Sequence, residues 1–175
     1  MFTVKDSIHV HAPVERCFLL STNLDFITQV FNIRLVAKGS SRTSGTIQGG
    51  DRLLWRGWKF GLPQTYESVI TGFERPTFFQ NTVKGGRFQQ LQIDHHLSDV
   101  DGYTLLINKL RFSPPLVWPG KLVARRVVVP YLSGLLRRRL LTLKLLAEGE
   151  DWRQYLPEED GVSGKSAGES PILTM

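Results

Sequence analysis

A few polar side chains fall within apolar segments of the sequence, where they could bind or transform a ligand. His95 and His96 are adjacent in a predicted strand, so their side chains point to opposite faces and cannot bind one metal ion together. The inner face is predicted to comprise Leu91, Ile93, His95 and Leu97, and the solvent face Gln90, Gln92, Asp94 and His96. An imidazole among apolar neighbours can hydrogen-bond a ligand or transfer a proton near neutral pH. Alternatively, His95 is a neutral core histidine that hydrogen-bonds a neighbouring strand residue such as Asn108.

Two other predicted strand faces would complete an apolar cavity with few polar groups. One face contains Leu53, Trp55, Gly57 and Lys59, and the other contains Leu106, Asn108, Leu110 and Phe112. If both point inward, hydrocarbon and aromatic groups would favour a lipid, an isoprenoid or a polyketide-like molecule. Alternatively, these residues simply pack against a long helix. The predicted ligand-binding residues are Trp55, Tyr66, Phe79, Asn81, Leu91, Ile93, His95, Leu106, Asn108, Leu110, Phe112, Tyr131 and Leu135.

The sequence contains no recognisable nucleophile, metal or cofactor motif. Its one cysteine, Cys17, falls on the apolar face of a short predicted helix, which indicates a core residue and not a reactive thiolate. Asp99 and Asp101 belong to a predicted hairpin turn without further carboxylates at calcium-loop spacing. Gly-x-Ser-x-Gly, P-loop and dinucleotide-binding patterns are missing from the sequence. We therefore expect no metal and no cofactor, and His95 is the one candidate catalytic residue.

The pattern of apolar residues predicts one strand, two short helices, six strands and a long helix. Residues 2–11 alternate as a half-buried strand, and residues 12–20 and 24–31 suit short helices. Six further strands are predicted at residues 32–38, 51–60, 64–74, 77–83, 88–97 and 103–112. Short polar turns between strands, such as 61–63 and 84–86, favour an antiparallel sheet and an α+β class. Such a sheet can curl around the long helix, predicted at residues 119–147, and leave a cavity between them.

The predicted long helix is strongly basic. The net charge is +6, and residues 121–147 contain seven basic side chains and no acidic one. Pro130 should kink or break this helix, and a kink there could gate the cavity. Leu132, Leu135, Leu136, Leu140 and Leu143 form an apolar stripe, while Arg137, Arg138, Arg139 and Lys144 are expected at its flanks or on the opposite side.

These charges leave two interpretations of the helix open. It is either the helix that the sheet grips, with a solvated basic face, or a basic amphipathic helix that contacts an anionic membrane transiently. No aromatic residues interleave with the basic ones in the helix, and no nucleic-acid-binding motif occurs, so no nucleic acid partner is expected.

Several short patterns occur in a characteristic order along residues 2–147. They are Ala12-Pro-Val-Glu15 with Phe18, Gly50 to Trp55, Phe60-Gly-Leu-Pro63 with Tyr66, Phe79-x-Asn81, Lys84-Gly-Gly-x-Phe88, His95, Asp101-Gly-x-Thr104 and Asn108-x-Leu110-x-Phe112 with Pro114. In these patterns the chain resembles START-like, or SRPBCC, proteins, and most resembles bacterial ligand-binding members labelled polyketide cyclase-like. The resemblance implies a helix-grip fold, in which a curved antiparallel seven-stranded sheet wraps around the long C-terminal helix, with two short helices between strands 1 and 2. It also implies a small hydrophobic ligand.

The chain departs from the family pattern at four positions. Asn81 stands where the pattern has Asp, Leu91 replaces Trp, Ile93 replaces the first His of His-x-His, and Phe112 replaces Tyr. Each change substitutes a less reactive group, which favours binding over catalysis. The alternative is a polyketide cyclase or dehydratase in which His95 with Asn81 or Tyr66 assists proton transfer.

The domain organisation is predicted to be simple. Residues 1–148 would form one ligand-binding domain, and residues 149–175, rich in acidic, Gly, Ser and Pro residues, an acidic flexible tail. No apolar segment is long enough to cross a membrane and no secretory leader is evident, so we expect a cytoplasmic protein. The sequence does not specify the ligand or the oligomeric state.

Overall fold

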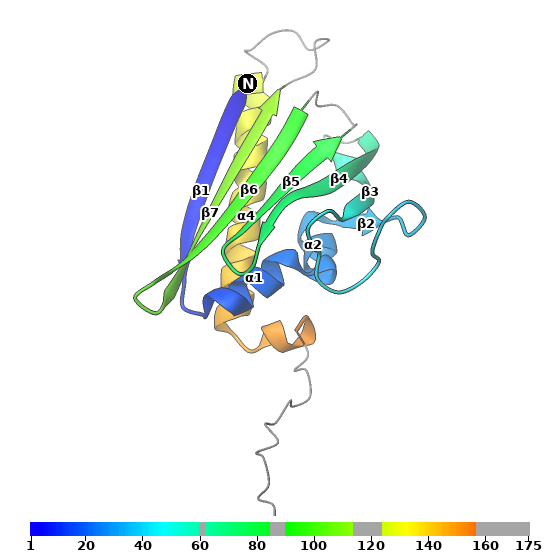
Figure 1. Cartoon of the computed structure of the whole chain (residues 1–175). Coiled ribbons are helices and arrows are strands. Elements are labelled where there is room, and N and C mark those ends of the chain that lie inside the picture. The colour runs from blue at the N-terminus through cyan, green and yellow to red at the C-terminus, as the bar shows by residue number, and fades with distance from the viewer. Residues whose placement is uncertain (60–61, 85–89, 114–123, 157–175) are drawn as a thin grey trace, which may run out of the picture.

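The computed structural model describes residues 1–59, 62–84, 90–113 and 124–156 (Figure 1). The strands are β1 (Phe2–Val10), β2 (Ile33–Leu35), β3 (Arg52–Lys59), β4 (Leu62–Glu74), β5 (Phe78–Lys84), β6 (Gln90–Val100) and β7 (Tyr103–Ser113). The helices are α1 (Val14–Thr22), α2 (Leu24–Phe31), the π-helical turn η1 (Ala124–Val128), α4 (Val129–Glu148) and the 3-10 turn η2 (Asp151–Gln154). Residue 61 of the predicted turn at 61–63, residues 85 and 86 of the turn at 84–86, and the predicted helix start at 119 lie outside the described residues.

All seven strands form one antiparallel sheet in the order β1-β7-β6-β5-β4-β3-β2. Strands that follow one another from β2 to β7 are neighbours in the sheet. Strand β1 pairs with β7, from Phe2 opposite Phe112 to Val10 opposite Thr104. The β6–β7 turn uses Asp101 at φ 53° and Gly102 at φ 84°, the left-handed backbone that a tight hairpin needs. The predicted seven-stranded antiparallel sheet is confirmed.

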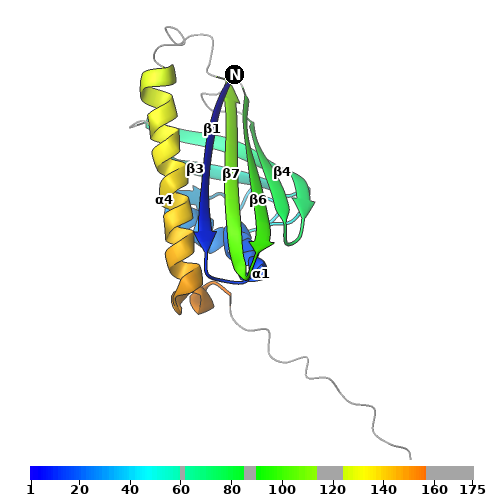
Figure 2. The ribbon, with the colours of Figure 1, turned by 90° about the vertical axis from the view of Figure 1, so that its left-hand side faces the viewer.

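Helix α4 lies along one face of the curved sheet, with α1 and α2 near its C-terminal end (Figures 1 and 2). Its Leu132, Leu136, Leu140 and Leu143 are buried, as the predicted apolar stripe requires. Pro130 does not break this helix, because η1 runs directly into α4 and Pro130 falls in the first turn of α4. A π-helical turn shifts the hydrogen-bond pattern, and a first turn needs no donor from the proline nitrogen.

Residues beyond α4 pack against the domain. Trp152, Tyr155 and Leu156 contact the main hydrophobic cluster. The guanidinium of Arg16 lies 4.3 Å from the centroid of the Trp152 ring, and the Asn23 amide donates to the Tyr155 carbonyl at 2.9 Å. The packed part of the chain therefore extends to Leu156, past the predicted domain boundary at 148. The flexible tail expected from there onward stays a prediction for residues 157–175, which lie outside the described part.

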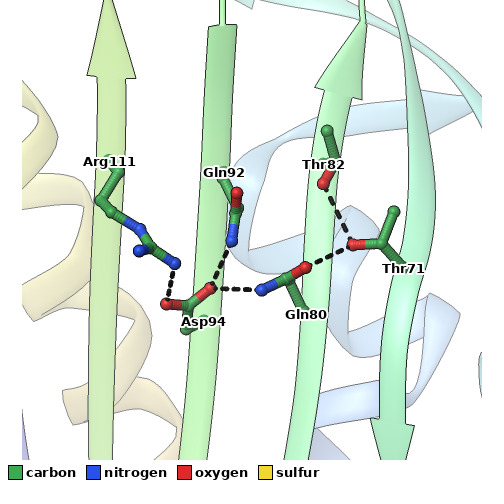
Figure 3. Close-up of polar contacts among 6 residues, drawn as sticks. All are labelled: Thr71, Gln80, Thr82, Gln92, Asp94 and Arg111. Atoms are coloured by element: carbon green, nitrogen blue, oxygen red, sulfur yellow. Dashed lines mark hydrogen bonds and ion pairs between the residues drawn. The ribbon is translucent and has the colours of Figure 1, made fainter. Parts of the chain in front are cut away.

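The outer face of the sheet corrects one expectation. Asp94 was predicted to face solvent, yet it is 5% exposed and buried within a polar network (Figure 3). Its carboxylate accepts hydrogen bonds from Gln80 and Gln92, both at 3.0 Å, and pairs with Arg111 at 2.5 Å. Strand alternation put Asp94 on the correct face, away from His95, but the long polar side chains from adjacent strands cover it there.

Candidate ligand-binding site

A cavity lies between the inner face of the sheet and α4. The volume of the cavity is about 90 Å³, and a water-sized group needs about 10–15 Å³ of such volume. The cavity therefore has room for roughly six to nine water-sized groups. Its wall is mostly aliphatic and aromatic, and α2 contributes Ile27 and Phe31 at one side.

Most of the predicted ligand-binding residues line this cavity. They are Trp55, Tyr66, Phe79, Asn81, Leu91, Ile93, His95, Leu110, Tyr131 and Leu135. Strand alternation explains the grouping, because these strand residues share the inner face and their neighbours point outward. Leu106, Asn108 and Phe112 are on the same face and are buried, but they do not line the cavity. Leu106 and Phe112 belong to the packed core, and Asn108 is bonded to His95.

Close packing at the β2–β3 pair shapes one end of the inner face. Gly57 pairs with Ile33, and a Cβ added at Gly57 would lie 2.7 Å from Cγ2 of Ile33. Only glycine therefore lets Ile33 lie over β3 and contribute to the cavity wall.

The imidazole of His95 is buried, and one of its two ring nitrogens makes a hydrogen bond. Its Nδ1 lies 2.7 Å from Oδ1 of Asn108, and its ring stacks on Phe79 with centroids 4.1 Å apart. With the Asn108 oxygen as acceptor, Nδ1 carries the proton and Nε2 is a bare acceptor. Burial, followed by the nearby charge of Arg139, lowers the pKa of His95 well below 6.5. His95 is therefore neutral at physiological pH, which agrees with the core-histidine interpretation and its Asn108 partner.

Some polar groups of the cavity wall have a hydrogen-bond partner among the described residues, and others do not. The Trp55 indole donates to Oγ of Ser68 at 2.7 Å. Burial raises the pKa of the Tyr66 phenol, so it is protonated at neutral pH. Oδ1 of Asn81 and Nε2 of His95 are buried and have no hydrogen-bond partner among the described residues. Two acceptors in the wall are thus without a donor from this part of the chain.

Arg139 is the residue that contradicts the sequence prediction most clearly. It was expected at the flank or the opposite side of the helix, but it is 5% exposed and lines the cavity. Its Nη2 donates to the Ser21 carbonyl at 2.9 Å, and its guanidinium lies 5.4 Å from the Phe31 ring centroid. Burial lowers its pKa to about 10, so it remains charged at pH 7.

Helical periodicity could have identified Arg139. It follows Leu132 by seven residues and Leu136 by three, so it falls on the same buried face. The basic composition of this segment indicated the opposite, because Arg139 follows two other arginines, Arg137 and Arg138. The cavity residues that the sequence prediction omitted are Ile27, Phe31, Ile33, Ile47, Leu53, Ser68, Ile70, Val83, Leu132 and Arg139.

The described residues contain neither a reactive thiol nor a metal-binding cluster. Cys17 is fully buried, and burial raises the pKa of its thiol to about 11, so it packs as a small apolar residue. Among the described residues, no group of three or more His, Cys, Asp or Glu side chains could hold a metal ion. In the same part of the chain, no helix is long and apolar enough to cross a membrane.

Sequence comparisons identify no relative, but the structure resembles many solved proteins. No family model and no curated protein matches the sequence. A START superfamily protein from Mycobacterium smegmatis superposes with a TM-score of 0.63 at 14% identity, over 82% of this chain and 98% of the other. The chain has the START-like, helix-grip fold. The motif-based resemblance is therefore confirmed at the level of the fold.

Two more solved structures have the same fold. A Thermus thermophilus protein superposes with a TM-score of 0.63 at 16% identity, over 82% of this chain and 95% of the other. The di-domain ARO/CYC StfQ from the steffimycin biosynthetic pathway gives 0.65 at 11% identity, over 83% of this chain and 50% of StfQ. The present START-like chain thus corresponds to half of the StfQ chain.

Proposed function

We propose that this START-like protein binds a small hydrophobic ligand in the cavity between the sheet and α4. The observation that carries the proposal is unfilled space bounded by apolar side chains such as Leu91, Ile93 and Leu135. Protein interiors normally pack with few voids larger than a water molecule. Apolar walls with a few convergent polar groups are typical of small-molecule sites.

The related structures are consistent with this proposal. The neighbours include a START superfamily protein and an ARO/CYC protein of a biosynthetic pathway. Their identities to this chain are low, so they support a ligand cavity as a common feature of the fold and do not name the ligand.

Binding is favoured over catalysis by the state of His95. A general acid or base works best when its pKa lies near the working pH. Burial moves the pKa of His95 well below 6.5, and Nδ1 is engaged with Asn108. In a cyclase or dehydratase of this kind, His95→Ala would abolish turnover of a polyketide substrate while leaving binding intact. In the proposed binding protein, the wild type releases the polyketide chemically unchanged.

A cavity-filling variant tests the site directly. Ile93→Trp adds a large side chain to the cavity wall, whereas Leu145→Trp adds the same side chain at a position that is 74% exposed. Binding of 1-hexanol, an apolar probe small enough for the cavity, should weaken at least tenfold in isothermal titration calorimetry of Ile93→Trp and stay unchanged in Leu145→Trp. Native mass spectrometry of the protein purified from its source should reveal a retained ligand. Probe binding that survives Ile93→Trp in a folded protein would contradict the site.

The outer face of α4 supports a second candidate function, contact with an anionic membrane surface. Val127, Leu141 and Leu145 are large hydrophobic residues that are 41–74% exposed along one side of η1 and α4. The exposed cations beside them are Arg125, Arg126, Arg137 and Arg138. An apolar stripe flanked by cations fits the interface of a bilayer that contains anionic lipid.

Co-sedimentation with vesicles tests this second function. The protein should bind vesicles of phosphatidylserine and phosphatidylcholine, and binding should decrease as salt rises from about 50 to about 500 mM. The double variant Leu141→Ser and Leu145→Ser should bind several-fold less. Equal binding to pure phosphatidylcholine would exclude the electrostatic contribution.

A further inference from the structure

The cavity wall contains a cation whose charge is not balanced by the described part of the chain. No ion pair between described residues involves Arg139. A guanidinium has five N–H donors, and the structure shows one protein acceptor, the Ser21 carbonyl. Burying a charge is costly unless it is paired and hydrogen-bonded. An anionic group bound in the cavity would supply the ion pair that Arg139 lacks among the described residues.

Arg139 determines the electrostatic character of the cavity. Among the described residues that line the cavity, it is the only one that is charged at pH 7, because His95 is neutral. The positive charge of Arg139 also acts on His95, because it helps to lower the pKa of the imidazole. The cavity thus combines apolar walls with a single positive charge contributed by α4.

We infer that the cavity binds an amphipathic carboxylic acid whose carboxylate pairs with Arg139 and whose apolar body lies against the aliphatic and aromatic wall. This inference rests on the proposed ligand-binding function and names the class of its ligand. A carboxylate carries one negative charge, which matches the single cation, and it can accept two parallel N–H bonds from a guanidinium. The space for roughly six to nine water-sized groups suits an acid of about six to eight carbons.

The hydrogen bond to Ser21 suggests a purely structural role for Arg139, and the two roles make different predictions. The Ser21 carbonyl belongs to the last turn of α1, where a cation stabilises the end of a helix. The contact with Ser21 uses one N–H donor of the Arg139 guanidinium. It does not account for the remaining N–H donors or for the position of Arg139 in the cavity wall. A structural role alone predicts no preference for the charge of a ligand.

Varying the ligand on the wild-type protein tests the inference without risk to folding. Sodium octanoate, 1-octanol and octylammonium share one apolar chain and differ in the charge of the head group. Isothermal titration calorimetry at pH 7.5 should give a dissociation constant for octanoate about 10- to 150-fold lower than for octanol, the range for hydrogen bonds to a charged group. Octylammonium should bind more weakly than octanol, because its charge repels Arg139.

Three variants test whether Arg139 causes the preference for octanoate over octanol. Arg139→Gln keeps an N–H donor for Ser21 but removes the charge, so octanoate and octanol should bind with similar affinity. Arg139→Lys keeps the charge and should retain most of the preference. Arg138→Gln is the matched control, because Arg138 is adjacent, exposed and outside the cavity lining, and it should behave as wild type. Thermal melts check that each variant is folded.

The outcomes distinguish this inference from the proposed function. If octanoate and octanol bind equally to the wild type, the carboxylate inference is overturned while ligand binding stands. If Arg139→Gln is folded and retains the octanoate preference, Arg139 is not the partner and the inference is overturned as well. If none of the three probes binds and 1-hexanol does not bind either, the proposed function itself fails.

Discussion

The buried imidazole of His95 should make the stability of the protein depend on pH in a predictable direction. In the folded protein its pKa is well below 6.5, chiefly because burial disfavours the charged form. In the unfolded chain it returns to about 6.5. Between these two values the unfolded chain binds more protons than the folded protein, so stability rises with pH. This contribution is complete above about pH 6.5 and is lost as the pH falls toward the folded pKa.

The size of the effect follows from proton linkage. Each pH unit within this window changes the free energy of unfolding by up to about 1.4 kcal/mol per group. From pH 7.5 to 5.0, the loss approaches about 2 kcal/mol for an imidazole that stays neutral in the folded protein. That is a substantial share of the roughly 5–15 kcal/mol typical of a folded domain.

Urea unfolding of wild type and His95→Gln at several pH values isolates this contribution. The substituted glutamine retains a donor for Asn108 but does not titrate, so the difference in free energy between the two proteins should change by about 2 kcal/mol from pH 7.5 to 5.0. His96→Gln is the matched control, since His96 is exposed on the opposite face, and it should keep the wild-type slope. Parallel pH profiles for wild type and His95→Gln would refute the reasoning.

Three further predictions concern the packing around the site. Cys17 should resist Ellman's reagent at pH 8 in the folded protein and react fully in guanidinium chloride, because its thiol is buried with a pKa of about 11; rapid labelling of the folded protein would contradict its placement. Leu143→Ala should lower the free energy of unfolding by about 2–5 kcal/mol, whereas Leu145→Ala should change it by no more than about 0.5 kcal/mol, because their side chains are 1% and 74% exposed; equal losses in urea unfolding would contradict the orientation of α4. Ser68→Ala should cost about 1–3 kcal/mol in thermal unfolding by leaving the Trp55 indole without its acceptor, and an unchanged melting temperature would count against that hydrogen bond.

Strand periodicity predicted the position of each strand closely. The predicted ends of a strand were less accurate where the backbone turns away from the sheet. Residues 2–10 form β1 with the expected alternation of exposed and buried side chains. The predicted strand at 32–38 is reduced to β2 at Ile33–Leu35. Beyond it the chain leaves the ladder and reaches Gly39 at φ 101°, a backbone that a regular strand does not adopt. Local pattern therefore located each strand, while local backbone geometry set its length.

The candidate site was predictable where neighbours in the sequence determine the orientation of a side chain. Strand alternation placed Trp55 and His95 on predicted inner faces, and both line the cavity. Which inner-face residues border empty space was not predictable, because Leu106 and Phe112 obey the same alternation and are packed in the core. That distinction depends on how α4 crosses the sheet.

The sequence by itself determined the class of the fold, the order of its elements and which strand residues face inward, since periodicities of about 2 and 3.6 residues are local properties of the chain. Only the tertiary structure decided the electrostatic character of the site. Three charged residues show this. Arg138 is exposed to solvent, and Arg139 lines the cavity. Asp94 is buried beneath side chains from neighbouring strands. Burial of a charge depends on what packs over it from distant parts of the chain, and composition carries no record of that contact.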